Sequence, residues 1–274
     1  MRAVDTGTRV ADVWLWYLLL GAVAGLLAGL LGIGGGLIQV PLLVFLFGHQ
    51  QFAPENVLHL ALGTAMASIL FTSLSSVRAH HGHAAVNWKI VRRMAPGIAF
   101  GVAIAAVIAG RLETRYLAMF FTTFVYFAAS QLMLNLRPQP TRTLPGAGGM
   151  FVVGAVIGGI SSLVAAGGAL LSVPYMSWCN VRLHEAIGTA AAIGFPIAIA
   201  GTIGYVANGW GAAHLPEWSL GYVYLPALVL LVVASMATAP IGAKLAHRTS
   251  TRKLRTLFAI LLYVLATRML ITLL

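Results

Sequence analysis

Long apolar runs with very few charges are the feature that most constrains how this chain can fold. Three of them extend from Gly97 to Gly110, from Met150 to Val164 and from Tyr222 to Ile241. Charged residues make up only 8% of the 274 residues, against roughly 25% in an ordinary soluble domain. Such a chain cannot build a water-soluble surface, so we predict an all-α polytopic membrane protein whose spanning helices need about 20 residues each. The runs also lack the alternation of apolar and polar residues that is typical of a membrane β-barrel.

The positive charge of the chain indicates how it is oriented in a membrane. Its 17 Lys and Arg residues against six acids give a formal charge of +11, and they lie mostly in short loops. No basic helix with interleaved aromatic residues occurs, so we expect no nucleic-acid partner, and basic loops are typical of the cytoplasmic face of a membrane protein. Cys179 is the only cysteine, and no Cys and His set has the spacing of a metal site. We therefore expect a surrounding lipid bilayer, no metal ion and no cofactor.

The two halves of the sequence repeat each other. The segment LLGIGGGLIQVP, from Leu30 to Pro41, returns as LVAAGGALLSVP, from Leu163 to Pro174. Further on, HLALGTAMA returns as HEAIGTAAA, and Tyr126 then corresponds to Tyr263. We predict an internal duplication with a first repeat over residues 1–136, a linker over 137–149 that contains Pro and Gly, and a second repeat over 150–274.

Five helical segments are predicted in each half. In the first half they cover residues 14–31, 36–47, 57–78, 90–110 and 114–134; in the second half they cover 150–164, 168–178, 184–206, 219–243 and 252–273. Asp5 and Asp12 interrupt the N-terminal apolar stretch, so we expect its helix to be retained and not cleaved as a signal peptide. The second segment of each half has about a dozen residues, or roughly 18 Å, and is too short to cross a 30 Å hydrocarbon core. We interpret these two segments as half-helices.

The distribution of Lys and Arg favours inverted repeats over parallel ones. Parallel repeats would divide the 17 basic residues about nine to eight between the two sides of the membrane. Inverted repeats, in which each half crosses an odd number of times, divide them about twelve to five and leave the loop from Ala207 to Trp218 without any. Because basic loops collect in the cytoplasm, we predict inverted repeats with both termini on the non-cytoplasmic side.

Glycine clusters at the start of the two half-helices predict a binding site for a small anion. Gly34, Gly35 and Gly36 are expected to open the first half-helix, and Gly167 and Gly168 the second. Helix N-termini present unpaired N–H groups and a positive dipole end, and glycine lets a ligand approach the backbone closely. Close packing of helices through small residues is the alternative explanation. Candidate ligands near these ends are the hydroxyl, amide and imidazole side chains of Gln39, His59, Thr64, Ser162, Ser172, His184 and Thr189.

Acidic residues are too few and too peripheral to relay a coupling ion. All six are expected near helix ends or in loops: Asp5, Asp12, Glu55, Glu113, Glu185 and Glu217. Coupling to protons or sodium would then have to use His59, His184 or backbone oxygens. The sequence also lacks a nucleotide-binding P-loop, so a gradient or a partner protein must supply the driving force.

Nearly the whole chain resembles the TauE/SafE family of membrane permeases, the sulfite and organosulfonate exporter group. The similarity lies in the pair GLLAGLLGIGGGLIQVPLL and GGISSLVAAGGALLSVPYM, and in HLALGTAMA with HEAIGTAAA. It implies transport of small sulfur-containing or carboxylated anions across the cytoplasmic membrane of a bacterium or archaeon. In the second copy Ala165 and Ala169 replace Gly32 and Gly36, so we expect one asymmetric site in which the first cluster fits the anion more closely.

The expected function is therefore a secondary permease, and three alternatives stay open. A passive anion channel would use the same site without coupling. An intramembrane hydrolase would use Ser161 or Ser162 with His184, but the chain lacks a GxSxG motif and a buried acid to orient the histidine, so we expect no enzyme activity. An accessory subunit that does not transport is the third. Substrate identity, direction, coupling ion and oligomeric state do not follow from the sequence.

Overall fold

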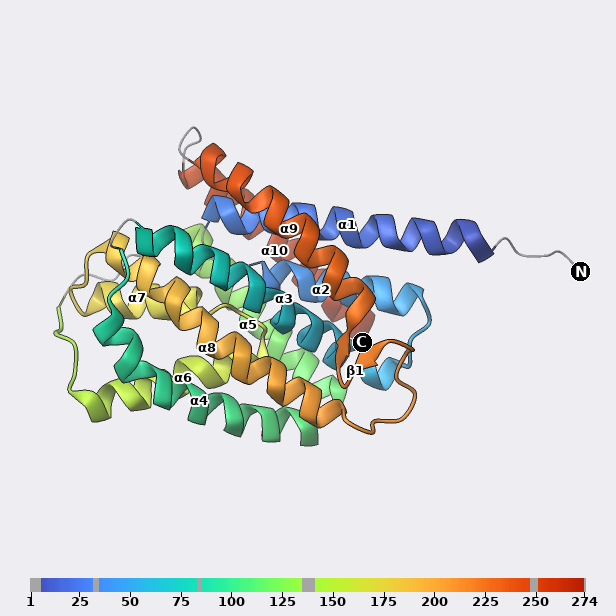
Figure 1. Cartoon of the computed structure of the whole chain (residues 1–274), viewed down its shortest axis with the longest axis horizontal. Coiled ribbons are helices and arrows are strands. Elements are labelled where there is room, and N and C mark those ends of the chain that lie inside the picture. Colours follow the sequence, from blue (N-terminus) through green and yellow to red (C-terminus); the bar gives the residue numbers. More distant parts are fainter. Residues whose placement is uncertain (1–5, 32–34, 83–84, 135–140, 247–250, 274) are drawn as a thin grey trace, which may run out of the picture.

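A computed structural model describes residues 6–31, 35–82, 85–134, 141–246 and 251–273 of the chain. The described part folds into ten helices and one short hairpin (Figure 1). The helices of the first half are α1 (Thr6–Leu31), α2 (Gly36–His49), α3 (Pro54–Gly82), α4 (Trp88–Arg111) and α5 (Thr114–Leu134). Those of the second half are α6 (Ala147–Leu163), α7 (Ala169–Trp178), α8 (Leu183–Gly209), α9 (Leu225–Ala246) and α10 (Thr251–Leu273). The all-α fold with five segments in each half is confirmed, whereas the limits of the two repeats stay a prediction.

Two predicted helix starts are wrong. The first helix, expected from residue 14, already begins at Thr6. The helix expected from residue 219 begins only at Leu225, because β1 (Ser219–Leu220) and β2 (Val223–Tyr224) form an antiparallel hairpin before it. Gly221 has a φ of +55° in the tight turn, a conformation that glycine adopts without steric cost. The hairpin places Tyr222 and Tyr224 against α3 at Gly63 and Thr64.

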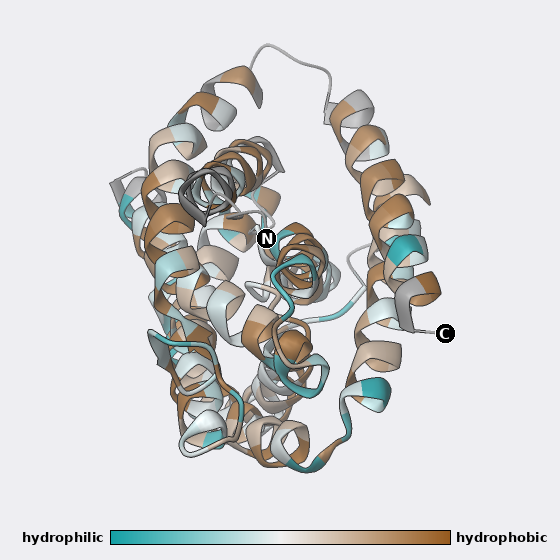
Figure 2. Cartoon of the chain, turned by 90° about the vertical axis from the view of Figure 1, so that its right-hand side faces the viewer, coloured by the Kyte–Doolittle hydropathy of each residue, from teal (hydrophilic) through white to brown (hydrophobic). Residues whose placement is uncertain are grey.

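Several helices are long and apolar enough to cross a bilayer. Within the described residues these are Pro54–Arg78, Trp88–Arg111, Thr114–Leu134, Leu183–Gly209 and Leu225–Gly242. Large apolar side chains on these helices are exposed, among them Phe100, Phe127, Ile203 and Val233. Figure 2 shows hydrophobic residues along the helices, with the most hydrophilic ones mainly in the connections. An apolar outer surface fits contact with lipid. The chain is a multi-pass membrane protein.

Helices of the two halves pack against each other. α1 packs along α9, and α6 packs along α4, so the first helix of each half contacts the fourth helix of the other (Figure 1). Both contacts are made through glycines: a Cβ at Gly21 would lie 2.7 Å from the Leu231 carbonyl oxygen, and one at Gly154 would lie 2.5 Å from that of Met94. Small residues let helices approach closely where lipid gives no hydrophobic drive for association. The third helices, α3 and α8, also contact each other.

The fifth helices, α5 and α10, are joined by two reciprocal hydrogen bonds. Tyr126 Oη bonds Thr267 Oγ1 and Tyr263 Oη bonds Ser130 Oγ, each at 2.7 Å. In both helices the hydroxyl residue lies four positions after the tyrosine. Parallel helices would separate the partners of the second bond by about eight residues, or about 12 Å, so α5 and α10 run antiparallel. Antiparallel packing of equivalent helices supports the predicted inversion of the repeats.

Candidate functional site

The two glycine breaks lie against each other inside the bundle. Gly36, the first residue of α2, packs so closely on the α6–α7 connection that a Cβ there would overlap the carbonyl oxygen of Ala165 and lie 2.8 Å from Ile69 Cδ1 of α3. On the other side, a Cβ at Gly194 of α8 would lie 2.7 Å from the carbonyl oxygen of Gly167. The starts of both half-helices are thus brought together beside α3 and α8. Gly34 lies outside the described residues.

At the first break, an amide side chain lies over the start of α2. Gly35 caps the helix, and its carbonyl oxygen accepts hydrogen bonds from the N–H groups of Ile38 and Gln39 at 3.1 and 3.0 Å. Gln39 is buried, and its Oε1 accepts a 2.5 Å hydrogen bond from Ser68 Oγ of α3. Its Nε2 lies 3.2 Å from where a Cβ at Gly35 would be. The amide donor of Gln39 therefore points to the backbone at the break.

The second break is more irregular and leaves two hydroxyl groups without partners. Ala165 and Gly168 have φ angles of +45° and +77°, and Gly168 caps α7 by accepting from the N–H of Ser172 at 2.9 Å. Ser161 and Ser172 are fully buried, and neither Oγ has a hydrogen-bond partner among the described residues. A buried hydroxyl without a partner costs free energy, so both are candidates for binding a ligand or water. Ser162 differs, since its Oγ donates to the Gly159 carbonyl at 3.0 Å.

The two histidines that correspond in sequence occupy different environments. His59 is buried; its Nε2 donates to the Ala109 carbonyl at 3.2 Å, and its ring lies 5.0 Å from that of Tyr222. His184 is exposed in the first turn of α8. Each is ten residues, or about 15 Å of helix, before the residue of its own helix that packs at the breaks, Ile69 or Gly194. Neither histidine therefore lies beside the glycine breaks.

Both predicted threonines are buried and accept hydrogen bonds from backbone N–H groups of the opposite half. Thr64 Oγ1 accepts from Tyr224 N at 3.0 Å, and Thr189 Oγ1 accepts from Asn87 N at 2.9 Å. The structure thus gives Thr64 and Thr189 positioning contacts.

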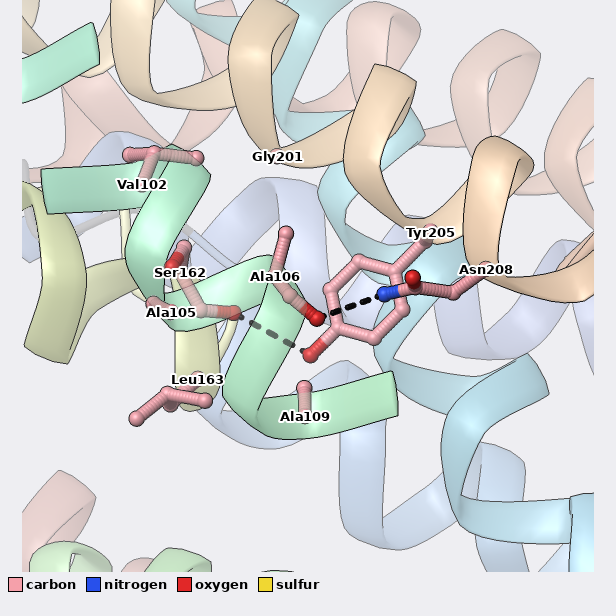
Figure 3. Close-up of a pocket in the computed structure, with 9 residues that line it drawn as sticks. All are labelled: Val102, Ala105, Ala106, Ala109, Ser162, Leu163, Gly201, Tyr205 and Asn208. Atoms are coloured by element: carbon pink, nitrogen blue, oxygen red, sulfur yellow. Dashed lines mark hydrogen bonds between the residues drawn. The ribbon is translucent and has the colours of Figure 1, made fainter. Parts of the chain in front are cut away.

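A small internal cavity adjoins the second break at Ser162. It has a volume of about 10 Å³, which is roughly enough for one water molecule. Figure 3 shows Tyr205 and Asn208 of α8 reaching across it, where Tyr205 Oη donates to the Ser162 carbonyl at 3.2 Å and Asn208 Nδ2 donates to the Ala106 carbonyl at 2.7 Å. These polar links join α8 to α6 and α4.

Sequence reasoning did not identify two polar residues of this region. Ser68 lies four residues after Thr64 on the same face of α3, and this spacing is the signal that could have indicated it. Tyr205 has no such signal, because a tyrosine in an apolar helix is equally typical of the membrane interface.

Comparison with known proteins places the chain among membrane permeases. A family model described as sulfite exporter TauE/SafE matches residues 17–269. A "probable membrane transporter protein" of Haemophilus influenzae is 35% identical over 253 residues, which cover 92% of this chain and 96% of the relative. A protein with the same description from Methanocaldococcus jannaschii is 23% identical over 261 residues, which cover 93% and 94% of the two chains. No solved structure matches the chain significantly.

Proposed function

Because the chain belongs to the sulfite exporter TauE/SafE family, we propose that it is a secondary permease for a small oxyanion, with sulfite or an organosulfonate as the substrate. That it is a membrane transporter follows from the family and from the relatives. The choice of substrate rests on the family description and on the chemistry of the breaks. We propose further that the two repeats are inverted in the membrane, which the antiparallel α5–α10 pair supports.

The observation that supports anion binding most strongly is the contact between the two half-helix starts. The first N–H groups of a helix lack intrahelical partners, and the dipole places partial positive charge at that end. Gln39 adds an amide donor, and the buried hydroxyls of Ser161 and Ser172 add two more. The acids whose side chains are described, Glu55, Glu113, Glu185 and Glu217, lie in loops or first turns. Donors without a nearby carboxylate favour an anion over a cation.

The proposed site consists of the residues at the breaks. They are Gly35, Gly36, Gln39, Ser161, Gly167, Gly168 and Ser172. His59 and His184 are not part of the site because they lie about three helical turns from the breaks. Thr64 and Thr189 are not part of it either, because their hydroxyl oxygens already accept hydrogen bonds from backbone N–H groups. An exposed His184 cannot activate either buried serine in this arrangement, so the geometry gives the hydrolase alternative no support.

The test is uptake of radiolabelled anions by the purified protein in proteoliposomes. We expect saturable uptake of sulfite or a small sulfonate that depends on an imposed proton or sodium gradient. Uptake that rises linearly with concentration and follows only the membrane potential would instead favour a channel. A panel of sulfite, thiosulfate, sulfonates and carboxylates identifies the preferred anion, and no uptake of any of them would contradict the proposal.

Alanine variants of Ser161 and Ser172 test the site itself. Ser161→Ala and Ser172→Ala should each raise the half-saturating concentration about tenfold or more, because a hydrogen bond to a charged group is worth roughly 1.5–3 kcal/mol. Ser162→Ala is the matched control, since its hydroxyl already bonds Gly159 and should leave uptake within about twofold of wild type. Equal effects of all three changes would disprove the assignment of the donors.

A further inference from the structure

Two segments, one from each half, are held in the same way by a Gly-Thr pair of the other half. The hairpin before α9 lies on Gly63 and Thr64 of α3, and the segment before α4 lies on Gly188 and Thr189 of α8. We call the hairpin residues Ser219–Tyr224 the hairpin gate and residues 85–87 the strand gate. The two Gly-Thr pairs are their seats.

Both seats contact their gate segment through the same pattern of backbone contacts. A Cβ at Gly63 would overlap the carbonyl oxygen of Tyr222, and Thr64 accepts from the N–H two residues later, at Tyr224. A Cβ at Gly188 would likewise overlap the carbonyl oxygen of Ala85, and Thr189 accepts from the N–H at Asn87. Glycine is needed in each seat for the close backbone approach, and threonine supplies the acceptor. The same contact formed twice, between equivalent positions, argues for a shared role.

The seats lie on the two sides of the candidate site. Thr64 is five residues before Ile69, which packs on Gly36, and Thr189 is five residues before Gly194, which packs on Gly167. Each seat is thus about 8 Å of helix from the breaks. Figure 1 shows the hairpin gate and the connection between α3 and α4 at opposite ends of the molecule.

We propose that the hairpin gate and the strand gate close the anion site from the non-cytoplasmic and the cytoplasmic side, and that Thr64 and Thr189 are the positioning residues that hold each gate shut. This inference rests on the proposed transport function. Gln39, Ser68, Ser161 and Ser172 are all buried while both seats are formed. An anion can reach them only when one seat opens, and alternating access requires that the other stay closed.

The contacts around the hairpin gate are aromatic. The ring of Tyr222 lies on that of His59. The ring centroid of Tyr224 lies 5.7 Å from that of Phe47 and 5.2 Å from that of Phe52. Phe47 lies near the end of α2, whose start forms half of the anion site. A shift of α2 on anion binding would therefore reach Tyr224 directly.

The contacts around the strand gate are polar. Asn87 caps α4 by accepting from the N–H groups of Lys89 and Ile90 at 3.1 and 3.2 Å. Its Nδ2 donates to Glu185 Oε1 at 2.6 Å, and Glu185 also pairs with Arg182 at 3.7 Å. Opening this gate would expose polar groups to water, whereas opening the hairpin gate would expose aromatic rings. The two gates should therefore differ in how readily they open.

Thiol labelling from each side of the membrane tests the gates without a transport substrate. Cys179→Ser removes the only cysteine, and Ser161→Cys then reports access to the site for a membrane-impermeant methanethiosulfonate. We expect Thr64→Val to raise the labelling rate from the non-cytoplasmic side about threefold to tenfold, as loss of one hydrogen bond predicts. Thr189→Val should do so from the cytoplasmic side only. Right-side-out and inside-out vesicles separate the two faces.

Two further variants separate gating from general loosening. Thr64→Ser and Thr189→Ser keep the hydroxyl and should restore the wild-type labelling rate. Thr122→Val, at a buried threonine of α5 without a partner among the described residues, should leave labelling unchanged on both sides. Equal labelling from both faces in either Thr→Val variant, or unchanged labelling in folded variants, would overturn the gates. Side-specific labelling without any anion uptake would keep the gates and reject only the proposed substrate class.

Discussion

Single residues at the first break differ sharply in how tightly they are packed. Gly36→Ala would push a methyl group into the carbonyl oxygen of Ala165, a backbone atom that cannot move aside. We predict a loss of stability of about 1–3 kcal/mol or more, the usual effect of overpacking a core. At Gly35 the nearest atoms to an added Cβ are 3.2 and 3.3 Å away, so Gly35→Ala should keep the fold and mainly reduce uptake. Thermal unfolding in detergent and uptake by proteoliposomes measure the two effects.

Gly48→Ala is the control for this pair of changes, because nothing lies within 4 Å of an added Cβ there. It should leave both the unfolding temperature and uptake close to those of wild type. If Gly36→Ala unfolds at the wild-type temperature, the close contact between the two breaks is not present in the membrane.

Sequence reasoning located the breaks but not all of their partners. Runs of glycine weaken a helix, so Gly35, Gly36 and Gly168 could be singled out without a fold. Ser68 could not, because which face of α3 meets Gln39 depends on how two distant segments pack. For the same reason His59 and His184 looked equivalent, although the hairpin covers only His59.

Among the helices, the α5–α10 pair offers the sharpest test of the internal duplication. Ser130 Oγ and Thr267 Oγ1 each donate to the carbonyl four residues earlier, so the tyrosine hydroxyls donate to them. We predict that Tyr126→Phe and Tyr263→Phe each lower the free energy of unfolding by about 0.6 kcal/mol, the average for such bonds between membrane helices. Reversible unfolding in mixed micelles provides the measurement.

A double-mutant cycle shows whether each loss comes from the bond itself. Tyr126→Phe combined with Thr267→Val should cost less than the sum of the single changes. Strongly unequal effects of the two tyrosine changes would contradict the reciprocal geometry.

At the level of helices, periodicity and length were good predictors except where tertiary contacts set a boundary. Apolar runs separated by glycine and proline gave all ten segments. The start of α9 was placed too early because the residues before Leu225 are as apolar as a helix. They form a hairpin instead, since Gly221 permits the turn and Thr64 of a distant helix holds Tyr224.

For the molecule as a whole, Lys and Arg residues are unequally distributed between its two ends. Six exposed Lys and Arg residues lie at the helix ends and connections opposite the hairpin, namely Arg78, Lys89, Arg92, Arg93, Arg142 and Arg182 (Figure 1). Fewer lie at the hairpin end, among them Arg111 and Arg115 beside the connection between α4 and α5. The connection from Trp210 to Trp218 at the hairpin end carries Glu217 and no Lys or Arg. Positive residues keep their loops in the cytoplasm, so we expect the hairpin end to face outward.

This orientation predicts opposite labelling of two exposed positions. With Cys179 changed to Ser, Ala213→Cys should react with an impermeant maleimide in intact cells, and Thr143→Cys should react only after permeabilisation. With inverted repeats, α6 and α7 begin and end on the same side of the membrane, so α8 is the single crossing between Thr143 and Ala213. If the α6–α7 pair crossed the bilayer instead, α8 would return the chain and both cysteines would be labelled from the same side. Same-side labelling would therefore reject the inverted repeats, and a reversed pattern would reject the orientation inferred from the basic loops.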